Sequence, residues 1–222
     1  DNNKKAAIVL TFDDWSPGHY PLVVPALSSR NINATFFVAL ASIPSAPEWT
    51  KVNTAATNGN EIANHTKTHP NLTALSGAQL KDEIRNMKSL IDLNIIGQKA
   101  LVVAYPFGSS NATVIDSVKA SGHIAGRSVS PGTYAYNFAP TNNSYYNIST
   151  FPMDNTVSIG AYTTQLNNVI AGGGLLTFLY HSIDNAAGTY GDNWFAKIID
   201  SNLGQQLDQI VAVKNTAWVT TF

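Results

Sequence analysis

Short runs of consecutive apolar residues recur along the chain, and most end in polar or glycine-rich segments. The first run, at residues 6–12, leads directly into Asp13 and Asp14. Apolar runs that do not alternate with polar residues are typical of strands buried on both faces, as in parallel sheets and barrels. The same pattern predicts strands at residues 34–38, 61–63, 101–104, 124–128, 175–180 and 217–220.

The segments between these strands carry apolar residues three or four positions apart, which predicts helices. The clearest helix covers residues 76–93, with Ser76 placed to cap its first turn. Further helices are expected at 20–29, 49–58, 111–121, 162–170 and within 194–213, whereas 131–149 predicts a long surface loop. Strands that alternate with helices indicate an α/β fold with a parallel sheet, here as one domain over residues 1–222.

Composition removes several classes of function. Only 12% of the residues are charged and the net charge is −1, so nothing favours nucleic acid or anionic lipid as a partner. No run of eighteen apolar residues predicts a membrane span. The absence of cysteine excludes disulfides, thiolate metal ligands and cysteine nucleophiles. The missing initiator Met indicates a processed domain, and we expect a secreted monomer that acts on a neutral polymer.

Candidate functional residues follow the predicted strands. The carboxyl ends of parallel strands meet at one rim, so these side chains are expected to converge there. His65 and His69 are four residues apart, and on a helical turn both rings would face one metal ion, with Asp14 as a third ligand. Taken alone, the His65 and His69 pair could be two unrelated surface histidines. Taken alone, Asp13-Asp14 could be a polar turn after a strand.

Two further positions could complete a hydrolytic site. His181 follows an apolar strand and could act as a general acid, although a core histidine bonded to the backbone is the alternative. The Pro106-Phe107-Gly108 turn could direct a backbone N–H toward an oxyanion.

Three segments resemble, in order and spacing, the first, second and fifth motifs of the polysaccharide deacetylases, which are carbohydrate esterase family 4 or the NodB-homology domain. They are residues 11–14 (TFDD), 65–69 (HTKTH) and 179–181 (LYH). Residues 34–38 and 218–222 also look like the sequence that flanks these motifs in the family. The resemblance spans nearly the whole chain and implies a distorted (β/α) barrel of about seven parallel strands.

The resemblance also implies roles for individual residues. Three would bind a divalent metal, usually zinc, with cobalt or nickel as alternatives: Asp14, His65 and His69. Asp13 matches the catalytic base and His181 the catalytic acid. Three would contact the substrate or its oxyanion: Phe107 through its N–H, the neighbouring Tyr105, and Leu179 beside the acetyl methyl group.

The chain departs from the family pattern in two places. The third motif commonly begins with an arginine that steadies the base, and here that position is Ala104. We hypothesise that Arg127, at the end of the next predicted strand, supplies the missing cation to Asp13; a surface arginine is the alternative. The fourth motif is not recognisable, and Asp154 is the candidate carboxylate partner of His181.

The expected activity is metal-dependent removal of acetyl groups from N-acetylglucosamine units of chitin, chitooligosaccharide or peptidoglycan. Removal of O-acetyl groups from acetylxylan is the first alternative. A second is a carbohydrate-binding pseudoenzyme that uses the aromatic residues of the long loop, Tyr134, Tyr136, Tyr145 and Tyr146. A metal-dependent phosphatase would need cationic phosphate clamps that are not evident in the sequence.

Overall fold

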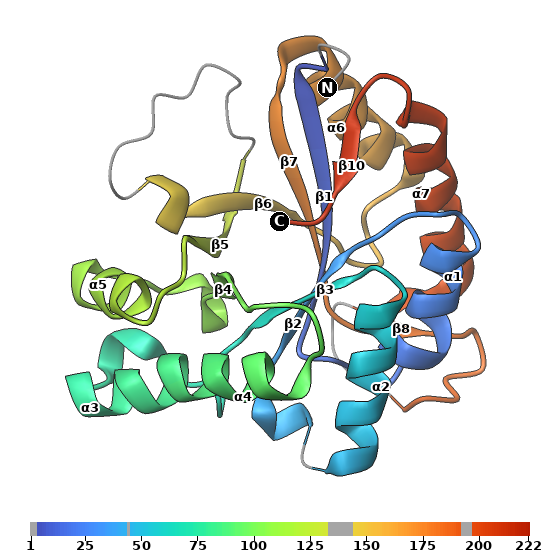
Figure 1. Ribbon diagram of the computed structural model, residues 1–222. Helices are drawn as coiled ribbons and strands as arrows, with labels where there is room; N and C mark the ends of the chain where they lie inside the picture. The colour runs from blue at the N-terminus through green and yellow to red at the C-terminus, as the bar shows by residue number, and fades with distance from the viewer. Residues whose placement is uncertain (1–3, 44, 133–143, 192–196) are drawn as a thin grey trace.

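The computed structural model of the chain describes residues 4–43, 45–132, 144–191 and 197–222 (Figure 1). Seven parallel strands pair in sequence order, and the last pairs with the first, so that they close a barrel. They are β1 (Ala6–Asp13), β2 (Thr35–Val38), β3 (Glu61–Asn64), β4 (Val102–Ala104), β5 (Ala125–Pro131), β6 (Ile148–Pro152) and β7 (Gly174–Tyr180). The predicted barrel of about seven parallel strands is confirmed.

The first strand has two partners on one of its edges. The amino-terminal half of β1 pairs with β10 (Trp218–Thr220), and its last residues pair with β2. On its other edge β1 pairs with β7 from Ala6 to Phe12. A separate short pair, β8 (Ile183–Asp184) and β9 (Ile198–Ile199), follows β7.

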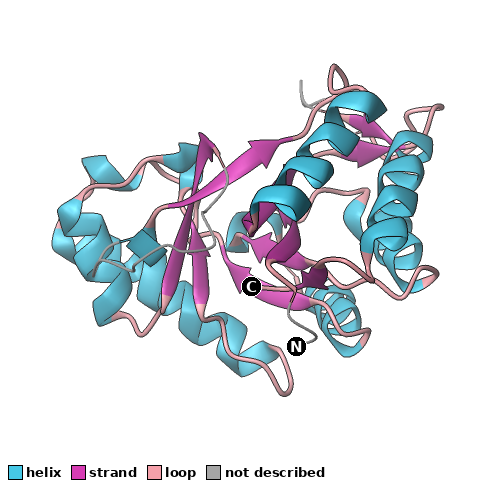
Figure 2. Ribbon diagram, turned by 90° about the horizontal axis from the view of Figure 1, so that it is seen from above, coloured by secondary structure: helices cyan, strands magenta, loops and turns pink. Residues whose placement is uncertain are grey.

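Helices flank the strands on several sides (Figures 1 and 2). They are α1 (Val24–Ser28), α2 (Ala46–Thr57), α3 (Gly77–Leu80), α4 (Met87–Asn94), α5 (Ala112–Ala120), α6 (Ile159–Gly172) and α7 (Asp200–Val213). The helix predicted at 76–93 consists of α3, a wide π-helical segment η4 (Lys81–Asn86) and α4. Another π-helical segment, η1 (His19–Val23), precedes α1. None of the helices in the described part of the chain has the length and apolarity needed to cross a membrane.

Local signals at the helix ends agree with the sequence. Asn111 caps α5 by accepting a hydrogen bond from Val114 N–H at 3.0 Å, and Gly122 follows the helix with φ of 82°. Ser76 occupies the N-cap of α3, as predicted.

The fold differs from expectation at β6, whose residues 148 and 149 were assigned to the long loop. Residues 133–143 of that loop, including Tyr134 and Tyr136, lie outside the described residues.

Among the residues that the structure describes, apolar side chains form three buried clusters. The largest lies between the strands and the helices, and a second packs β4 against α3 and α5. The third lies on the strands from β2 to β6 and contains Phe37, Ala63, Val102, Ala104, Ala125 and Ile148. Arg127 of β5 lies over the Phe37 ring, with Cζ 4.9 Å from its centroid, so a charged side chain joins this apolar group.

Candidate active site

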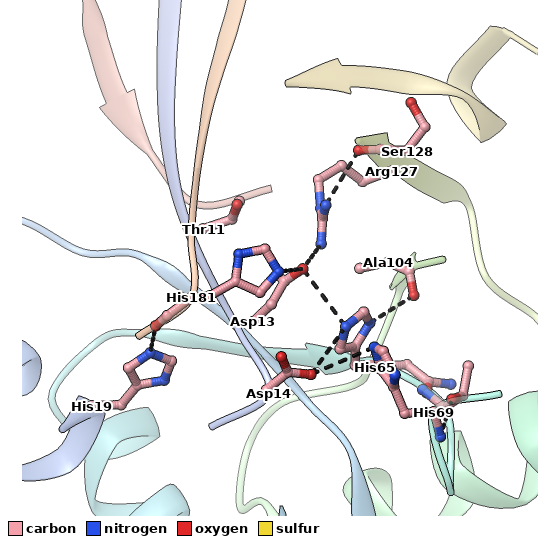
Figure 3. A network of polar contacts seen from close by, with 12 residues as sticks. Thr11, Asp13, Asp14, His19, His65, His69, Ala104, Arg127, Ser128 and His181 are labelled. Carbon is pink, nitrogen blue, oxygen red and sulfur yellow. Dashed lines mark hydrogen bonds and ion pairs between the residues drawn. The ribbon is translucent and has the colours of Figure 1, made fainter. Parts of the chain in front are cut away.

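The end of β1 presents the two adjacent aspartates. Asp13 is the last residue of the strand and is buried, whereas Asp14 follows it and is partly exposed. Asp14 and Trp15 both have positive φ, of 70° and 53°. Consecutive non-glycine residues in the left-handed region are strained, so this turn is held in place by its surroundings. The turn sends the two carboxylates in different directions, as Figure 3 shows.

The two histidines of the HTKTH segment follow β3. The prediction that they share a helical turn is wrong, since residues 65–70 form an irregular loop. Thr66 and His69 have positive φ, of 69° and 60°, and the reversal brings the two rings together with centroids 4.7 Å apart. The four-residue spacing therefore indicated the right pair of residues but the wrong backbone.

Asp14, His65 and His69 come together as the sequence predicted. One ligand atom from each lies within 4.8 Å of the others. Asp14 Oδ1 is 3.4 Å from His65 Nε2 and 3.6 Å from His69 Nε2. His65 Nδ1 is 2.9 Å from the Ala104 carbonyl oxygen, which can only accept, so Nδ1 carries the proton and Nε2 offers a lone pair. Two imidazole nitrogens and one carboxylate oxygen form a donor set that fits a divalent cation such as zinc.

Arg127 contacts Asp13 in the arrangement that we hypothesised. Its Nη2 donates to Asp13 Oδ2, and its Nη1 donates to the Ser128 carbonyl oxygen at 3.2 Å (Figure 3). Arg127 is paired in register with Ala104 of the neighbouring strand. The cation missing at position 104 is thus delivered from the same level of the barrel, one strand away.

Burial and neighbouring charge set the protonation of the site. Burial disfavours the charged form of Asp13, but Arg127, together with smaller contributions from His65 and His181, outweighs it and holds the pKa of this carboxyl below its ordinary value. Burial lowers the pKa of His65 to about 4 and also lowers the pKa of His69. Both imidazoles are therefore neutral near pH 7, which is the form that binds a metal.

His181 lies on the opposite side of Asp13 from His65. It directly follows β7, and its Nε2 is 3.9 Å from Asp13 Oδ2. The buried ring of His19 lies 2.5 Å, through Nε2, from the carbonyl oxygen of His181. His19 was not predicted to take part in the site. Its distance of 162 positions from His181 gives no sequence signal, because the contact depends on η1 folding against the end of β7.

The remaining predicted residues divide into two groups. Phe107 is 63% exposed, has φ of 58°, and places its ring edge-on to His69 with centroids 4.8 Å apart. Leu179 is buried near the end of β7. Tyr105 does not face a substrate, since it is fully buried and its hydroxyl donates to the Tyr146 carbonyl oxygen at 2.9 Å. The prediction that Tyr105 contacts the substrate is therefore not supported; its side chain packs in the interior instead.

The Asp154 carboxylate accepts hydrogen bonds from a residue in its own turn. Asp154 Oδ1 accepts from Thr156 N–H at 2.7 Å and from Thr156 Oγ1 at 2.6 Å. The described carboxylate next to His181 is that of Asp13, so Asp154 is not supported as its partner. Tyr146 also differs from expectation, because its hydroxyl donates to the His123 carbonyl oxygen at 3.0 Å and Lys119 lies over its ring.

Comparisons with known proteins identify relatives of this chain. The family profile described as Polysaccharide deacetylase matches residues 1–125. The chitooligosaccharide deacetylase of Rhizobium leguminosarum bv. trifolii is 33% identical over 109 residues, which are 49% of this chain and 49% of that protein. The peptidoglycan-N-acetylmuramic acid deacetylase PdaA of Bacillus subtilis (strain 168) is 28% identical over 123 residues, 55% of this chain and 46% of that protein. The chain spans half or less of the length of these curated relatives.

Solved structures share the fold. A family 4 carbohydrate esterase from Streptomyces lividans, in complex with acetate, gives a TM-score of 0.62 at 19% identity, over 97% of this chain and 92% of that chain. A Mycobacterium smegmatis protein assigned to the polysaccharide deacetylases gives 0.73 at 15% identity, over 98% and 87%. The profile match covers more than half of the 222 residues. The chain belongs to the polysaccharide deacetylase family.

Proposed function

We propose that this protein is a metal-dependent hydrolase that removes acetyl groups from N-acetylglucosamine units of chitin, chitooligosaccharide or peptidoglycan. The observation that carries the proposal is the gathering of a cation-binding set and an acid–base pair at one mouth of the barrel. Family membership supports hydrolytic deacetylation, and the names of the relatives support sugars that carry N-acetyl groups.

Asp14, His65 and His69 would hold the cation, with zinc as the first choice and cobalt or nickel as alternatives. When bound, such a cation polarises the acetyl carbonyl and lowers the pKa of water toward neutrality. The Ala104 carbonyl oxygen fixes the tautomer of His65, so that ring needs no rearrangement to act as a ligand.

Asp13 is the proposed general base. It accepts a proton from the water molecule whose oxygen attacks the acetyl carbon. Arg127 keeps Asp13 ionised in a buried position and fixes the direction of its carboxylate through Oδ2. Oδ2 is also the carboxylate oxygen that faces the site, 3.6 Å from His65 Nε2 and 3.9 Å from His181 Nε2, so it is the one placed to receive that proton.

His181 is the proposed general acid. Its imidazolium gives a proton to the amide nitrogen as the carbon–nitrogen bond breaks, which releases acetate and a free amino sugar. The exposed turn at Phe107 supports a role for its backbone N–H in binding the oxyanion. Leu179 supplies an apolar surface for the acetyl methyl group.

A groove with a volume of about 750 Å³ leads away from Asp14 and His181. Its walls include Trp15, Tyr20 and Tyr190, together with serine hydroxyls, and one charged pair, Glu48 with Lys51 at 2.5 Å. Beyond Asp14 and His181, aromatic and hydroxyl groups with one paired charge suit a neutral sugar polymer. Such polymers lie in cell walls and extracellular material, so we also propose that the protein is secreted and acts as a monomer.

The test is acetate release from chitin oligomers, peptidoglycan and acetylxylan side by side, with zinc, cobalt or EDTA added. The proposal expects cation-dependent release from at least one N-acetylated polymer. Release from acetylxylan alone would move the substrate to O-acetyl esters. Oligosaccharide binding without acetate release, at saturating zinc and cobalt, would favour a carbohydrate-binding pseudoenzyme.

A further inference from the structure

The loop that joins His65 to His69 has its backbone N–H groups satisfied by side chains. Thr66 N–H donates to Asn64 Oδ1 at 2.8 Å, and His69 N–H donates to Thr66 Oγ1 at 3.1 Å. The two N–H groups between them, of Lys67 and Thr68, both donate to one carboxylate oxygen. A strained loop of this kind depends on the side chains that accept from it.

That carboxylate belongs to Glu83. Its Oε2 accepts from Lys67 N–H at 2.9 Å and from Thr68 N–H at 2.8 Å, and its Oε1 accepts from Thr68 Oγ1 at 2.6 Å. Glu83 is only 8% exposed. A carboxylate that accepts several hydrogen bonds in a buried position holds the groups around it in a fixed geometry.

The position of Glu83 is itself fixed from two sides. It lies in the π-helical segment η4, and π-helical turns inside α-helices are frequent at functional sites. Its neighbour Ile84 is buried in the cluster between β4 and the helices, and the Ile84 carbonyl oxygen accepts from Asn64 Nδ2 at 2.8 Å. The same helical turn therefore supports both the start and the middle of the loop.

We propose that Glu83 is a positioning residue that holds His65 and His69 in the geometry needed to bind the cation. This inference rests on the proposed function, because it takes Asp14, His65 and His69 as the cation ligands. Glu83 touches none of the reacting atoms, and its effect passes through the backbone of Lys67 and Thr68. It lies outside the sequence motifs that marked the site.

The experiment is a titration of the metal-free protein with Co²⁺ and Zn²⁺. Binding is monitored by calorimetry and, for Co²⁺, by the visible absorption of the bound ion. Glu83→Ala is expected to weaken cation affinity about 10- to 100-fold, the usual cost of losing a group that orients metal ligands. It should also change the Co²⁺ spectrum at saturation. Glu83→Gln retains an oxygen that can accept from the loop, so it should recover most of the affinity.

Asp82→Asn provides the matched control. Asp82 is adjacent and acidic, but it contacts Lys67 through the side-chain Nζ at 2.9 Å rather than through the backbone. The cation affinity of Asp82→Asn should equal that of the wild type. The inference is overturned if folded Glu83→Ala binds cation like the wild type, or if Asp82→Asn weakens binding equally. Thermal unfolding of each metal-free variant identifies the folded fraction for the titration.

The outcome also separates this inference from the proposed function. If the wild-type protein bound neither Co²⁺ nor Zn²⁺, the cation site itself would be wrong. If the wild type binds and is active, and Glu83→Ala matches it in affinity and spectrum, only the role of Glu83 is wrong.

Discussion

The guanidinium of Arg127 lies against the carboxylate of Asp13, and the two residues are 114 positions apart in the sequence. Both side chains are buried, and Arg127 is held on its other sides by the Ser128 carbonyl oxygen and the Phe37 ring. A buried carboxylate keeps its charge only if a cation accompanies it. The reactivity that we propose for Asp13 therefore depends on a side chain in the barrel interior.

Replacing Arg127 by alanine should lower kcat for deacetylation by about 100-fold or more, because Asp13 loses the cation that keeps it ionised and oriented. The free energy of unfolding should fall by roughly 3–5 kcal/mol, since a buried charge is left without its partner. Arg127→Lys should be intermediate, as it keeps the charge but not the planar fork. Acetate release and urea denaturation measure the two effects. Unchanged turnover in folded Arg127→Ala would end this interpretation.

Removal of the cation should abolish deacetylation, and zinc or cobalt should restore it. Asp14→Asn should weaken cation affinity by more than about 100-fold, exceeding the cost of losing an outer-shell group. Asparagine tolerates positive φ, so the turn at position 14 should survive. In the metal-free wild type the Asp14 carboxylate faces the lone pairs of the two imidazoles without a cation between them. Asn removes that repulsion, so we expect the metal-free variant to unfold at or above the wild-type temperature. Calorimetry and thermal unfolding provide the measurements, and wild-type affinity in Asp14→Asn would contradict the assignment.

Buried His123 should make the protein less stable in mild acid. Burial lowers the pKa of this imidazole to about 4, while in the unfolded chain its pKa is near the ordinary value of 6.5. Below pH 6.5 the unfolded state takes up a proton that the folded state does not. Stability is therefore lost as the pH falls from 6.5 toward 4, by up to about 3 kcal/mol.

Urea denaturation of the metal-free protein at several pH values, compared with His123→Gln, tests this expectation. Glutamine can still accept from Asn64 Nδ2, which lies 3.0 Å from His123 Nε2. The variant should lose less stability between pH 6.5 and 4 than the wild type does. Parallel curves for the two proteins would show that His123 is not responsible.

The groove beside the site should matter for long substrates only. Tyr190→Ala removes an aromatic wall residue, and should lower kcat/KM on chitin oligomers roughly 10- to 100-fold by removing about 1.5–3 kcal/mol of apolar contact. Activity on a single N-acetylglucosamine unit should not change. Tyr145→Ala is the control, since Tyr145 is 49% exposed but does not line the groove. A loss that is equal on short and long substrates would count against a polymer-binding groove.

Much of the fold follows from one-dimensional patterns. Unalternating apolar runs at β1, β2 and β7 identified strands covered on both faces, and the polar residues after them marked one rim. β6 was missed because its sequence, Ile148–Pro152, has neither a continuous apolar run nor a regular alternation, and it follows a polar loop. The π-helical turn η4 leaves the three- and four-residue spacing almost intact, so the 76–93 pattern could not reveal it.

The sequence predicted that the five motif residues would lie close together, and they do, because they end or follow strands of a parallel barrel. The loop between the histidines was not predicted, since a four-residue spacing fits both a helical turn and a reversal with two positive φ values. Glu83 and His19 could not be found, because their contacts depend on backbone groups that are distant in sequence. A side chain that hydrogen-bonds to the backbone of another segment does not require a particular residue type there, so the contact produces no recognisable sequence motif.

The register of Arg127 with Ala104 has a consequence for how such a barrel can diversify. Since the partner of Asp13 comes from β5, the segment after β4 carries no side chain that the base requires. Side-chain replacements at Pro106–Gly108 can then reshape the entrance without disturbing the proton acceptor, provided that the Phe107 N–H keeps its position. The base and its cation are set by β1 and β5, and the side chains of the turn after β4 can vary independently of that pair.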